Sequence, residues 1–351
     1  MSFSNILIYW YLQIKRDLPW RKTKDPYLVW LSEIMLQQTR VSQGMSYYLA
    51  FSTVFPTVED LANAEESKIL KMWQGLGYYS RARNLHFTAK YVSTELNGTF
   101  PKTYEELIKL KGIGDYTASA IASICFNEPA AVVDGNVYRV LARYFQIATP
   151  INSTQGIKEF KNLAQSLLDK TQPGVYNQAI MDFGALQCKP QNPDCHHCPI
   201  SSSCLAFDKK LVKELPVKEK KLKVKKKYFN YIVLVTKENK TIFEERKGKG
   251  IWQGLYQFPL IETATEVALD ELVDSTDFQT LVTMNASIEL FNEISIVHKL
   301  SHQHLFTKFW ILSTDYHQKA LINWQEIELF PVPVLIANFL KEYKPKLKEI
   351  F

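Results

Sequence analysis

The feature that most constrains the fold is a change of sequence pattern near residue 228. Before about residue 200, segments of helical length alternate with short turns marked by Gly or Pro, such as QGLGYYSRAR and TQPGVYN. After residue 228, YFNYIVLVT, LYQFPLI and TKFWILST have the β-branched and aromatic character of strands, whereas VALDELVDS and VPVLIANFLKEY read as helices. We therefore predict an all-α N-terminal domain and an α+β C-terminal domain, for which 351 residues are sufficient.

A short basic segment separates the two patterns. Residues 206–227 carry a net charge of +7, whereas residues 1–205 carry +3 and residues 228–351 carry −4. Positive charge concentrated at a domain boundary suits contact with a polyanion, and a solvated linker is the alternative interpretation. We predict a helical domain over 1–205, a basic linker over 206–227 and an α+β domain over 228–351.

The composition, 46% hydrophobic and 22% charged, is that of an ordinary soluble protein. No apolar run approaches the length that crosses a bilayer, so we expect no contact with a membrane. The N-terminal stretch MSFSNILIYWYLQIKRD has none of the features of a signal peptide, and we expect a cytoplasmic protein.

A Gly-Ile-Gly turn lies between the helix-like segments YEELIKLK and DYTASAIASI. Gly112 and Gly114 allow a tight turn with positive φ, where a side chain would clash. The turn also opens the second helix, whose first N–H groups have no partner within that helix and suit an anion such as a DNA phosphate. An ordinary packing corner between two helices is the alternative.

Two carboxylates have surroundings that favour different protonation states. Glu33 lies in the apolar stretch VWLSEIML, where burial would raise its pKa and keep it protonated, as a general acid requires. Asp134 follows the apolar run AAVV and suits a helix N-cap, which would hold it as an anion. Such a pair suits cleavage of a glycosidic bond through an oxocarbenium-like transition state. A Glu33 hydrogen-bonded on a polar helix face is the alternative.

Four of the five cysteines are spaced as C-x6-C-x2-C-x5-C, at Cys188, Cys195, Cys198 and Cys204. Four thiols within 17 residues of a cytoplasmic chain indicate a metal centre instead of disulfides. The spacing is not that of a paired zinc ribbon, and an iron–sulfur cluster requires four thiolates; zinc remains open on these grounds. Cys125, in ASICFN, is expected to be a buried apolar residue.

Taken in order, these motifs resemble those of the helix–hairpin–helix DNA glycosylases with a [4Fe–4S] cluster, and more narrowly the MutY-type adenine DNA glycosylases. The resemblance covers most of residues 15–205. It runs through LPWR, DPYLVWLSEIMLQQTRV, GLGYYSRARNLH, LKGIGDYTA, VDGNVYRVLAR, MDFGALQC and the four-cysteine loop. It implies a helix–hairpin–helix glycosylase domain with an iron–sulfur loop, followed by a Nudix-like domain that recognises 8-oxoguanine.

The resemblance also implies roles for individual residues. Glu33 would protonate an adenine flipped out of the duplex, and Asp134 would stabilise the sugar cation, with Tyr116 and Asn136 positioning the two carboxylates. The implied adenine pocket is lined by Arg16, Trp20, Arg21 and Gln178. The implied residues in the base stack and around the opposite lesion are Gln38, Thr39, Leu76, Tyr78, Ser301 and His302, and the hairpin contributes Lys111, Gly112 and Gly114 to phosphate binding.

Differences between this sequence and the motifs of related enzymes narrow the predicted function. Endonuclease III-like enzymes carry a lysine at the position of Tyr116, which forms a Schiff base with the sugar, so Tyr116 predicts a monofunctional glycosylase. The Nudix catalytic signature is absent after LYQFPLIET, and we predict no pyrophosphatase activity. Leu300 replaces the usual Phe before Ser301 and His302, and a purely structural His302 is the alternative to a lesion contact.

The resulting prediction is a monomeric, nucleoid-associated, monofunctional glycosylase that removes adenine opposite 8-oxoguanine or guanine in double-stranded DNA. A bifunctional oxidised-pyrimidine glycosylase/lyase is the first alternative, and Tyr116 argues against it. A non-catalytic DNA-binding scaffold is the second, and the presence of Glu33, Tyr116 and Asp134 together argues against that.

Overall fold

The computed structural model describes residues 2–219, 224–281, 287–313 and 320–350, with side chains up to residue 343 in the last helix. The chain forms two compact units, one of residues 1–63 and 84–220 and the other of residues 64–83 and 221–351. The predicted boundaries at 205 and 228 remain a proposal. The compact units differ from them because residues 64–83 pack with the C-terminal part of the chain.

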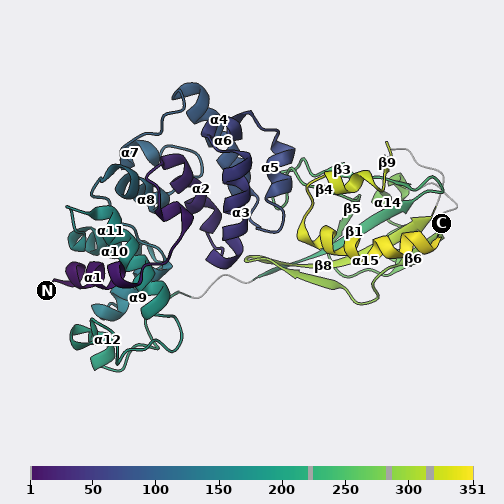
Figure 1. Cartoon of the computed structure of the whole chain (residues 1–351). Coiled ribbons are helices and arrows are strands. Elements are labelled where there is room, and N and C mark those ends of the chain that lie inside the picture. Colours follow the sequence, from purple (N-terminus) through teal and green to yellow (C-terminus); the bar gives the residue numbers. More distant parts are fainter. Residues whose placement is uncertain (1, 220–223, 282–286, 314–319, 351) are drawn as a thin grey trace. The chain divides into compact units, whose positions relative to one another are not determined.

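The first unit is helical throughout its described residues, as predicted, and Figure 1 shows its helices. Its longer helices are α1 (Phe3–Ile14), α2 (Pro26–Leu36), α3 (Val41–Val54), α8 (Asp115–Phe126), α9 (Gly135–Tyr144), α10 (Thr154–Leu167) and α11 (Pro173–Asp182). Shorter helices are α4 (Val58–Asn63), α7 (Tyr104–Leu107) and α12 (Leu205–Asp208), and most of α6 (Ser80–Glu95) also belongs here.

Helix α8 is central to this unit because it packs against α2, α7 and α11. Its alanines Ala118, Ala120 and Ala122 are fully buried, and such small side chains allow neighbouring helices to approach closely. The alanine-rich sequence after the Gly-Ile-Gly turn therefore allows α8 to pack closely against α2, the helix that carries Glu33.

The hairpin between α7 and α8 confirms one of the two predicted glycine roles. Gly112 has φ +82°, and a Cβ atom there would lie 2.7 Å from the Cβ of Asn84, so no larger residue fits without strain. Gly114 has φ −93° and is the N-cap of α8, so the prediction of positive φ was wrong for this residue. A Cβ atom at Gly114 would meet nothing within 4 Å, which leaves open space before the first turn of α8.

The second unit contains a five-stranded sheet in which β1 (Lys225–Val235) and β8 (Gln303–Ser313) are parallel neighbours (Figure 1). The sheet order is β5-β1-β8-β6, and β7 also pairs with β8. The flanking strands β5 (Leu260–Thr263), β6 (Ser287–Leu290) and β7 (Ile296–Lys299) are antiparallel to their partners. Two short ladders pair β2 (Lys240–Thr241) with β9 (Ile322–Asn323) and β3 (Glu244–Glu245) with β4 (Tyr256–Gln257). The α+β prediction is confirmed.

Both faces of the sheet are covered, which explains the nearly continuous apolar run of β1. Ile232 and Leu234 pack in one cluster with Phe278, which belongs to α14 (Thr276–Leu281). On the alternate positions, Tyr231 stacks on Phe309. Helices α13 (Leu269–Val273), α15 (Val334–Ile350) and α5 (Glu66–Met72) complete the unit.

The basic segment 206–227 is only partly a linker. Its first residues belong to α12, Leu215 is buried, and the N–H of Ile151 donates to the carbonyl oxygen of Val217 at 3.0 Å. Its last three lysines belong to β1, which begins at Lys225, and residues 220–223 lie outside the described residues. In the described part of the chain, no helix combines the length and apolarity that a membrane span requires.

Candidate active site

Helix α2 places Glu33 in an apolar environment. Asp25 caps the helix by accepting from the N–H of Tyr27 at 2.9 Å, and Pro26 occupies the first helical position. The Glu33 residue is only 9% exposed. This burial raises the pKa of Glu33 to about 7, with an opposing effect of the Tyr116 hydrogen bond. Glu33 is therefore a buried acid that carries a proton near neutrality, and its hydrogen-bond partner Tyr116 belongs to the neighbouring helix α8.

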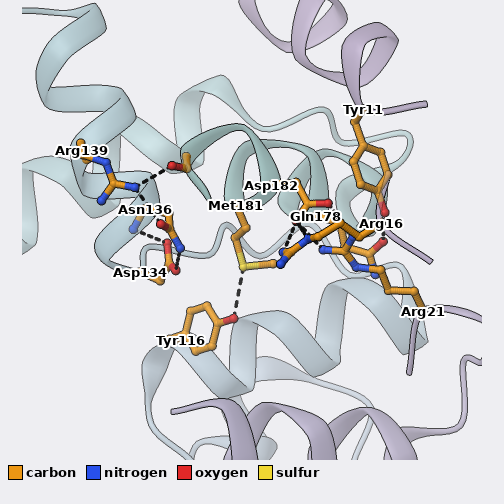
Figure 2. A network of polar contacts seen from close by, with 11 residues as sticks. Tyr11, Arg16, Arg21, Tyr116, Asp134, Asn136, Arg139, Gln178, Met181 and Asp182 are labelled. Atoms are coloured by element: carbon orange, nitrogen blue, oxygen red, sulfur yellow. Dashed lines mark hydrogen bonds and ion pairs between the residues drawn. The ribbon is translucent and has the colours of Figure 1, made fainter. Parts of the chain in front are cut away.

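Asp134 is the N-cap of α9, as predicted. Its Oδ1 accepts from the N–H groups of Asn136 at 2.9 Å and Val137 at 2.8 Å. Its Oδ2 accepts from Asn136 Nδ2 at 2.7 Å (Figure 2). Burial raises the pKa of Asp134 from its ordinary value, while these hydrogen bonds act in the opposite direction. The three donors also fix both carboxylate oxygens in place.

Tyr116, in the first turn of α8, lies close enough to both carboxylates to interact with them. Burial raises its pKa well above the ordinary value, and the charges of Glu33 and Asp134 raise it further, so the phenol stays neutral. Its hydroxyl donates to the Sδ atom of Met181 at 3.1 Å. The charge of Asp134 also raises the pKa of Glu33. The structure therefore brings Glu33, Tyr116 and Asp134 into one cluster.

Arg139, which was not predicted from the sequence, fixes the side chain of Asn136 through a hydrogen bond. Its Nη2 donates to Asn136 Oδ1 at 2.8 Å and to the carbonyl oxygen of Gly184 at 2.7 Å, as Figure 2 shows. Its Nε donates to the carbonyl oxygen of Cys188 at 2.7 Å. A buried arginine in the apolar stretch VYRVLAR is the signal that could have identified it.

Asp182 is a second residue that the sequence reasoning missed. It is fully buried and accepts from Arg21 Nη2 at 2.7 Å and from Arg16 Nε at 3.1 Å (Figure 2). Burial alone would raise the pKa of Asp182, but the hydrogen bonds and charges of Arg21 and Arg16 outweigh it and hold the pKa below its ordinary value. Both arginines predicted for the adenine pocket are thus fixed by one carboxylate.

The other two residues predicted for that pocket differ in their surroundings. Gln178 is partly buried, and its Oε1 accepts from the hydroxyl of Tyr11 at 2.7 Å. Trp20 is buried, with its ring centroid 5.0 Å from that of Tyr48 in an edge-on arrangement. Trp20 is thus a largely buried side chain.

The predicted DNA contacts of the helical unit lie on its surface. Gln38 is exposed with φ +56°, and Thr39 donates from Oγ1 to the carbonyl oxygen of Gln37 at 3.3 Å. Lys111 is exposed at the hairpin, with its Nζ 4.1 Å from the ring centroid of Phe87. The charge of Lys111 is therefore available at the surface beside the open first turn of α8.

The second unit contains a cavity of about 450 Å³ that brings together Tyr78, Ser301 and His302. Ser301 Oγ lies 3.3 Å from His302 Nδ1, and both residues are exposed. Aromatic and apolar side chains, among them Trp252 and Leu300, also line the cavity. Leu76 is buried and does not line this cavity.

The four clustered cysteines line a common cavity in the loop after α11. The Cys198 thiol interacts electrostatically with those of Cys188, Cys195 and Cys204, and Arg143 Nη1 lies 3.5 Å from Cys188 Sγ. In the described part of the chain, no three His, Cys, Asp or Glu side chains converge closely enough to hold a single metal ion. The four thiols therefore line one shared cavity.

A buried acid on α2 beside a carboxylate that caps α9, next to the helix that opens with the glycine hairpin, is an arrangement suited to glycosidic bond cleavage on DNA. The family of HhH-GPD superfamily base excision DNA repair proteins matches residues 31–166, and the NUDIX domain family matches residues 230–342. The class of protein is therefore a helix–hairpin–helix DNA N-glycosylase of base excision repair, with a Nudix-like second domain.

Individual relatives narrow this class. An adenine DNA glycosylase of Buchnera aphidicola subsp. Baizongia pistaciae is 35% identical over 318 residues, which cover 89% of this chain and 86% of that protein. An adenine DNA glycosylase of Mus musculus is 46% identical over 217 residues, which cover 59% of this chain and 42% of that protein. The chain belongs to the adenine DNA glycosylase family, and DNA is its partner.

A solved structure agrees with the fold of the helical part. A thermostable thymine-DNA glycosylase superimposes with a TM-score of 0.55 at 31% sequence identity, covering 59% of this chain and 95% of that protein. The predicted resemblance and fold class are both confirmed.

Proposed function

We propose that this adenine DNA glycosylase removes adenine opposite 8-oxoguanine or guanine in duplex DNA, with water as the final acceptor of the sugar. The cluster of Glu33, Tyr116 and Asp134 is the observation that carries the proposal. It combines a carboxyl group whose pKa is raised to about 7 with a carboxylate whose oxygens accept three hydrogen bonds.

In the proposed reaction, Glu33 donates its proton to a ring nitrogen of the extruded adenine. The C1′–N9 bond breaks, its electron pair stays with the base, and the positive charge remains on the sugar. Asp134, held by Asn136, stabilises that cation in a water-poor site where a fixed charge acts strongly. Water then adds to C1′, and its proton returns to Glu33.

Tyr116 supports a monofunctional reaction. A neutral phenol supplies no amine for a Schiff base, and Lys111 lies at the hairpin surface over Phe87. We therefore propose that the enzyme leaves an intact abasic strand. One chain carries both Glu33 and the cavity lined by Ser301 and His302, which supports action as a monomer. We also propose that the enzyme acts in the nucleoid.

Several residues outside the catalytic cluster have surroundings that suit contacts with DNA. The open space at Gly114 and the exposed Lys111 suit a phosphate at the first turn of α8. Arg16 and Arg21, fixed by Asp182, suit the rim of an adenine pocket together with Gln178. Further contacts are proposed for Gln38, Thr39, Leu76 and Trp20, with Leu76 and Trp20 acting from buried positions.

We assign the cavity of the second unit to the base opposite adenine. Its volume of about 450 Å³ and its lining of aromatic side chains together with polar and basic ones suit one nucleobase of a nucleic acid. Tyr78 would enter the base stack, while Ser301 and His302 would offer hydrogen bonds that distinguish 8-oxoguanine from guanine. Leu300 at the same cavity supplies apolar contact where related enzymes use Phe.

The Ser301→Ala, His302→Ala double variant tests this assignment. We expect the preference for 8-oxoguanine over guanine to narrow by about 2- to 10-fold, the effect of a typical hydrogen bond. The measurement is the ratio of single-turnover rates on two duplexes that differ only in the opposite base. A Ser287→Ala variant, at the start of β6, is the control, and an unchanged ratio in the double variant would place lesion recognition elsewhere.

The four-thiol cavity supports a [4Fe–4S] cluster held by Cys188, Cys195, Cys198 and Cys204. Thiols that surround a space fit a polynuclear cluster better than a single zinc ion, and an apolar cavity suits such a cluster. When bound, the cluster would fix the fold of the loop that follows α11. Arg139 and Arg143, which donate to carbonyl oxygens of Cys188 and Lys189, hold this loop against α9.

The proposal is tested by incubating the purified protein with a duplex that carries one adenine opposite 8-oxoguanine. We expect strand cleavage only after alkali, at the position of that adenine, and no protein–DNA adduct with borohydride. Cleavage without alkali together with a trapped adduct would favour the bifunctional alternative. Binding of the duplex without base release would favour the non-catalytic scaffold.

A further inference from the structure

The loop before α6 presents Tyr78 in a backbone conformation that needs support. Gly75 and Gly77 have φ of +96° and +76°, and Tyr78 has φ +47°, in the left-handed region that residues other than glycine rarely adopt. The Tyr78 side chain is 46% exposed and lines the cavity that also contains Ser301 and His302. A bulky residue keeps such a conformation only when its surroundings enforce it.

Arg81, in the first turn of α6, supplies that support from below the loop. It is 8% exposed, and its Nη2 donates to the carbonyl oxygens of Leu76 at 3.2 Å and Gly77 at 3.0 Å. The Gly77 carbonyl oxygen also accepts from Trp73 Nε1 at 3.0 Å, so two donors hold this peptide unit. The orientation of the Gly77–Tyr78 peptide is therefore fixed on its carbonyl side.

The same guanidinium also contacts the aromatic side chains. Its central carbon lies 5.3 Å from the ring centroid of Trp73 and 5.6 Å from that of Tyr78. Both distances are within the range of cation–π attraction, which strengthens when the cation is removed from water. Burial lowers the pKa of Arg81 to about 10, so the group keeps its charge at neutral pH.

We propose that Arg81 is the positioning residue for Tyr78. It holds the backbone of the preceding residues and the ring of Tyr78 with one guanidinium, so that Tyr78 is ready to enter the base stack when DNA binds. This inference rests on the proposed role of Tyr78 in the base stack. Arg81 itself would touch neither the adenine nor the opposite base, and it would act only through Tyr78.

The physical reason for an arginine here is its planar, delocalised guanidinium group. One Nη2 group reaches two carbonyl oxygens while the flat face stays available to the rings, an arrangement that a lysine ammonium cannot reproduce. Without these contacts the two neighbouring glycines, which tolerate many backbone conformations, would let the loop relax. The loop would then have to become ordered each time DNA binds, and this ordering would weaken DNA binding.

The test is a double-mutant cycle of Arg81→Met and Tyr78→Ala. We expect each single variant to lower the single-turnover rate of adenine release by about 10- to 100-fold, the combined effect of one cation–π contact and charged hydrogen bonds. If Arg81 acts through Tyr78, the double variant is no slower than Tyr78→Ala within about 2-fold. Multiplied effects in the double variant would overturn the proposal.

Amide hydrogen exchange of the free protein supplies a readout that needs no DNA. In Arg81→Met we expect faster exchange at residues 75–79, with no change in Lys90→Met, which alters an exposed residue of the same helix. Unchanged exchange at residues 75–79 would overturn the positioning role. Faster exchange together with undiminished adenine release by Tyr78→Ala would retain the positioning role and remove Tyr78 from the proposed reaction.

The Arg81→Lys variant is the control for the case in which Arg81→Met fails to fold. It keeps a cation beneath the rings and loses the planar guanidinium whose Nη2 reaches the two carbonyl oxygens, so we expect exchange rates between those of the wild type and Arg81→Met. A 2-aminopurine placed next to the adenine reports base unstacking by its fluorescence, and the unstacking rates of the three proteins should follow the same order. A Lys variant whose exchange and unstacking both equal those of the wild type would assign the support of the loop to charge alone and overturn the role of the guanidinium.

Discussion

Glu33→Gln should lower the single-turnover rate of adenine release by about 10²- to 10⁴-fold while the affinity for duplex DNA stays unchanged. Glutamine has nearly the same shape as glutamic acid but has no proton to give to the departing base. The buried position of Glu33 leaves little room for water to replace it as an acid. Single-turnover kinetics and a gel-shift titration on the same duplex measure the two quantities separately.

The pH dependence provides the internal control for this prediction. Because Glu33 acts in its protonated form and its pKa is about 7, the wild-type rate should fall about tenfold per pH unit above that value. Glu33→Gln should lack this break. Undiminished release by the variant, or a wild-type rate that stays level up to pH 9, would remove Glu33 from the mechanism.

The same pKa shift has a consequence for stability. The folded-state pKa of about 7 lies above the ordinary value of 4.5, so the stabilisation from the bound proton is complete below pH 4.5 and is lost as the pH rises through 7. At pH 8, Glu33→Gln should therefore unfold with a free energy about 3 kcal/mol higher than the wild type. Near pH 4.5 the two proteins should be equally stable, which urea titrations at both pH values would check.

Asp182→Asn should destabilise the helical unit by about 3–5 kcal/mol at neutral pH, because Arg16 and Arg21 would lose the carboxylate that accepts hydrogen bonds from both of them. Asp182 is fully buried, and the side chains of Arg16 and Arg21 are 30% and 11% exposed. Its pKa is depressed, so this contribution is present above the ordinary value of 3.8 and is lost as the pH falls further. Urea-induced unfolding measures the change.

Asp17→Asn is the matched control, since the ion pair of Asp17 with Lys22 is exposed on both sides. We expect a change below about 1 kcal/mol for this surface pair. Adenine release should fall in Asp182→Asn even at temperatures where the variant is folded, because Arg16 and Arg21 would no longer be fixed. Equal stability of the two variants would show that the buried network contributes nothing beyond a surface pair.

The chemistry of the site could be predicted where it depends on local sequence. The burial of Glu33 follows from apolar neighbours on almost every face of its own helix, and the capping by Asp134 follows from the residues directly after it. Likewise, the spacing of four cysteines within 17 residues allows a single short loop to bring them together. These inferences needed only helical periodicity, capping chemistry and chain connectivity.

Residues that act through distant partners could not be assigned in this way. Asp182 is 161 residues from Arg21 in the sequence, and no local pattern in MDFGALQC indicates that two arginines converge on it. The contact of the buried Trp20 ring with Tyr48, 28 residues further along the chain, was not visible in the sequence either. For the same reason, the support of Asn136 by Arg139 became visible only once α9 and the segment after α11 were packed together.

By itself, the sequence determined the succession of helices and strands, the shielded acid, the capped carboxylate and the cysteine loop, because each depends on residues a few positions apart. Only the tertiary structure decided which charges meet in the interior, and which loops share a cavity. It joined Tyr78 to Ser301 and His302 across more than 200 residues of chain. Such contacts arise from the packing of complete helices and sheets, which local sequence patterns do not predict.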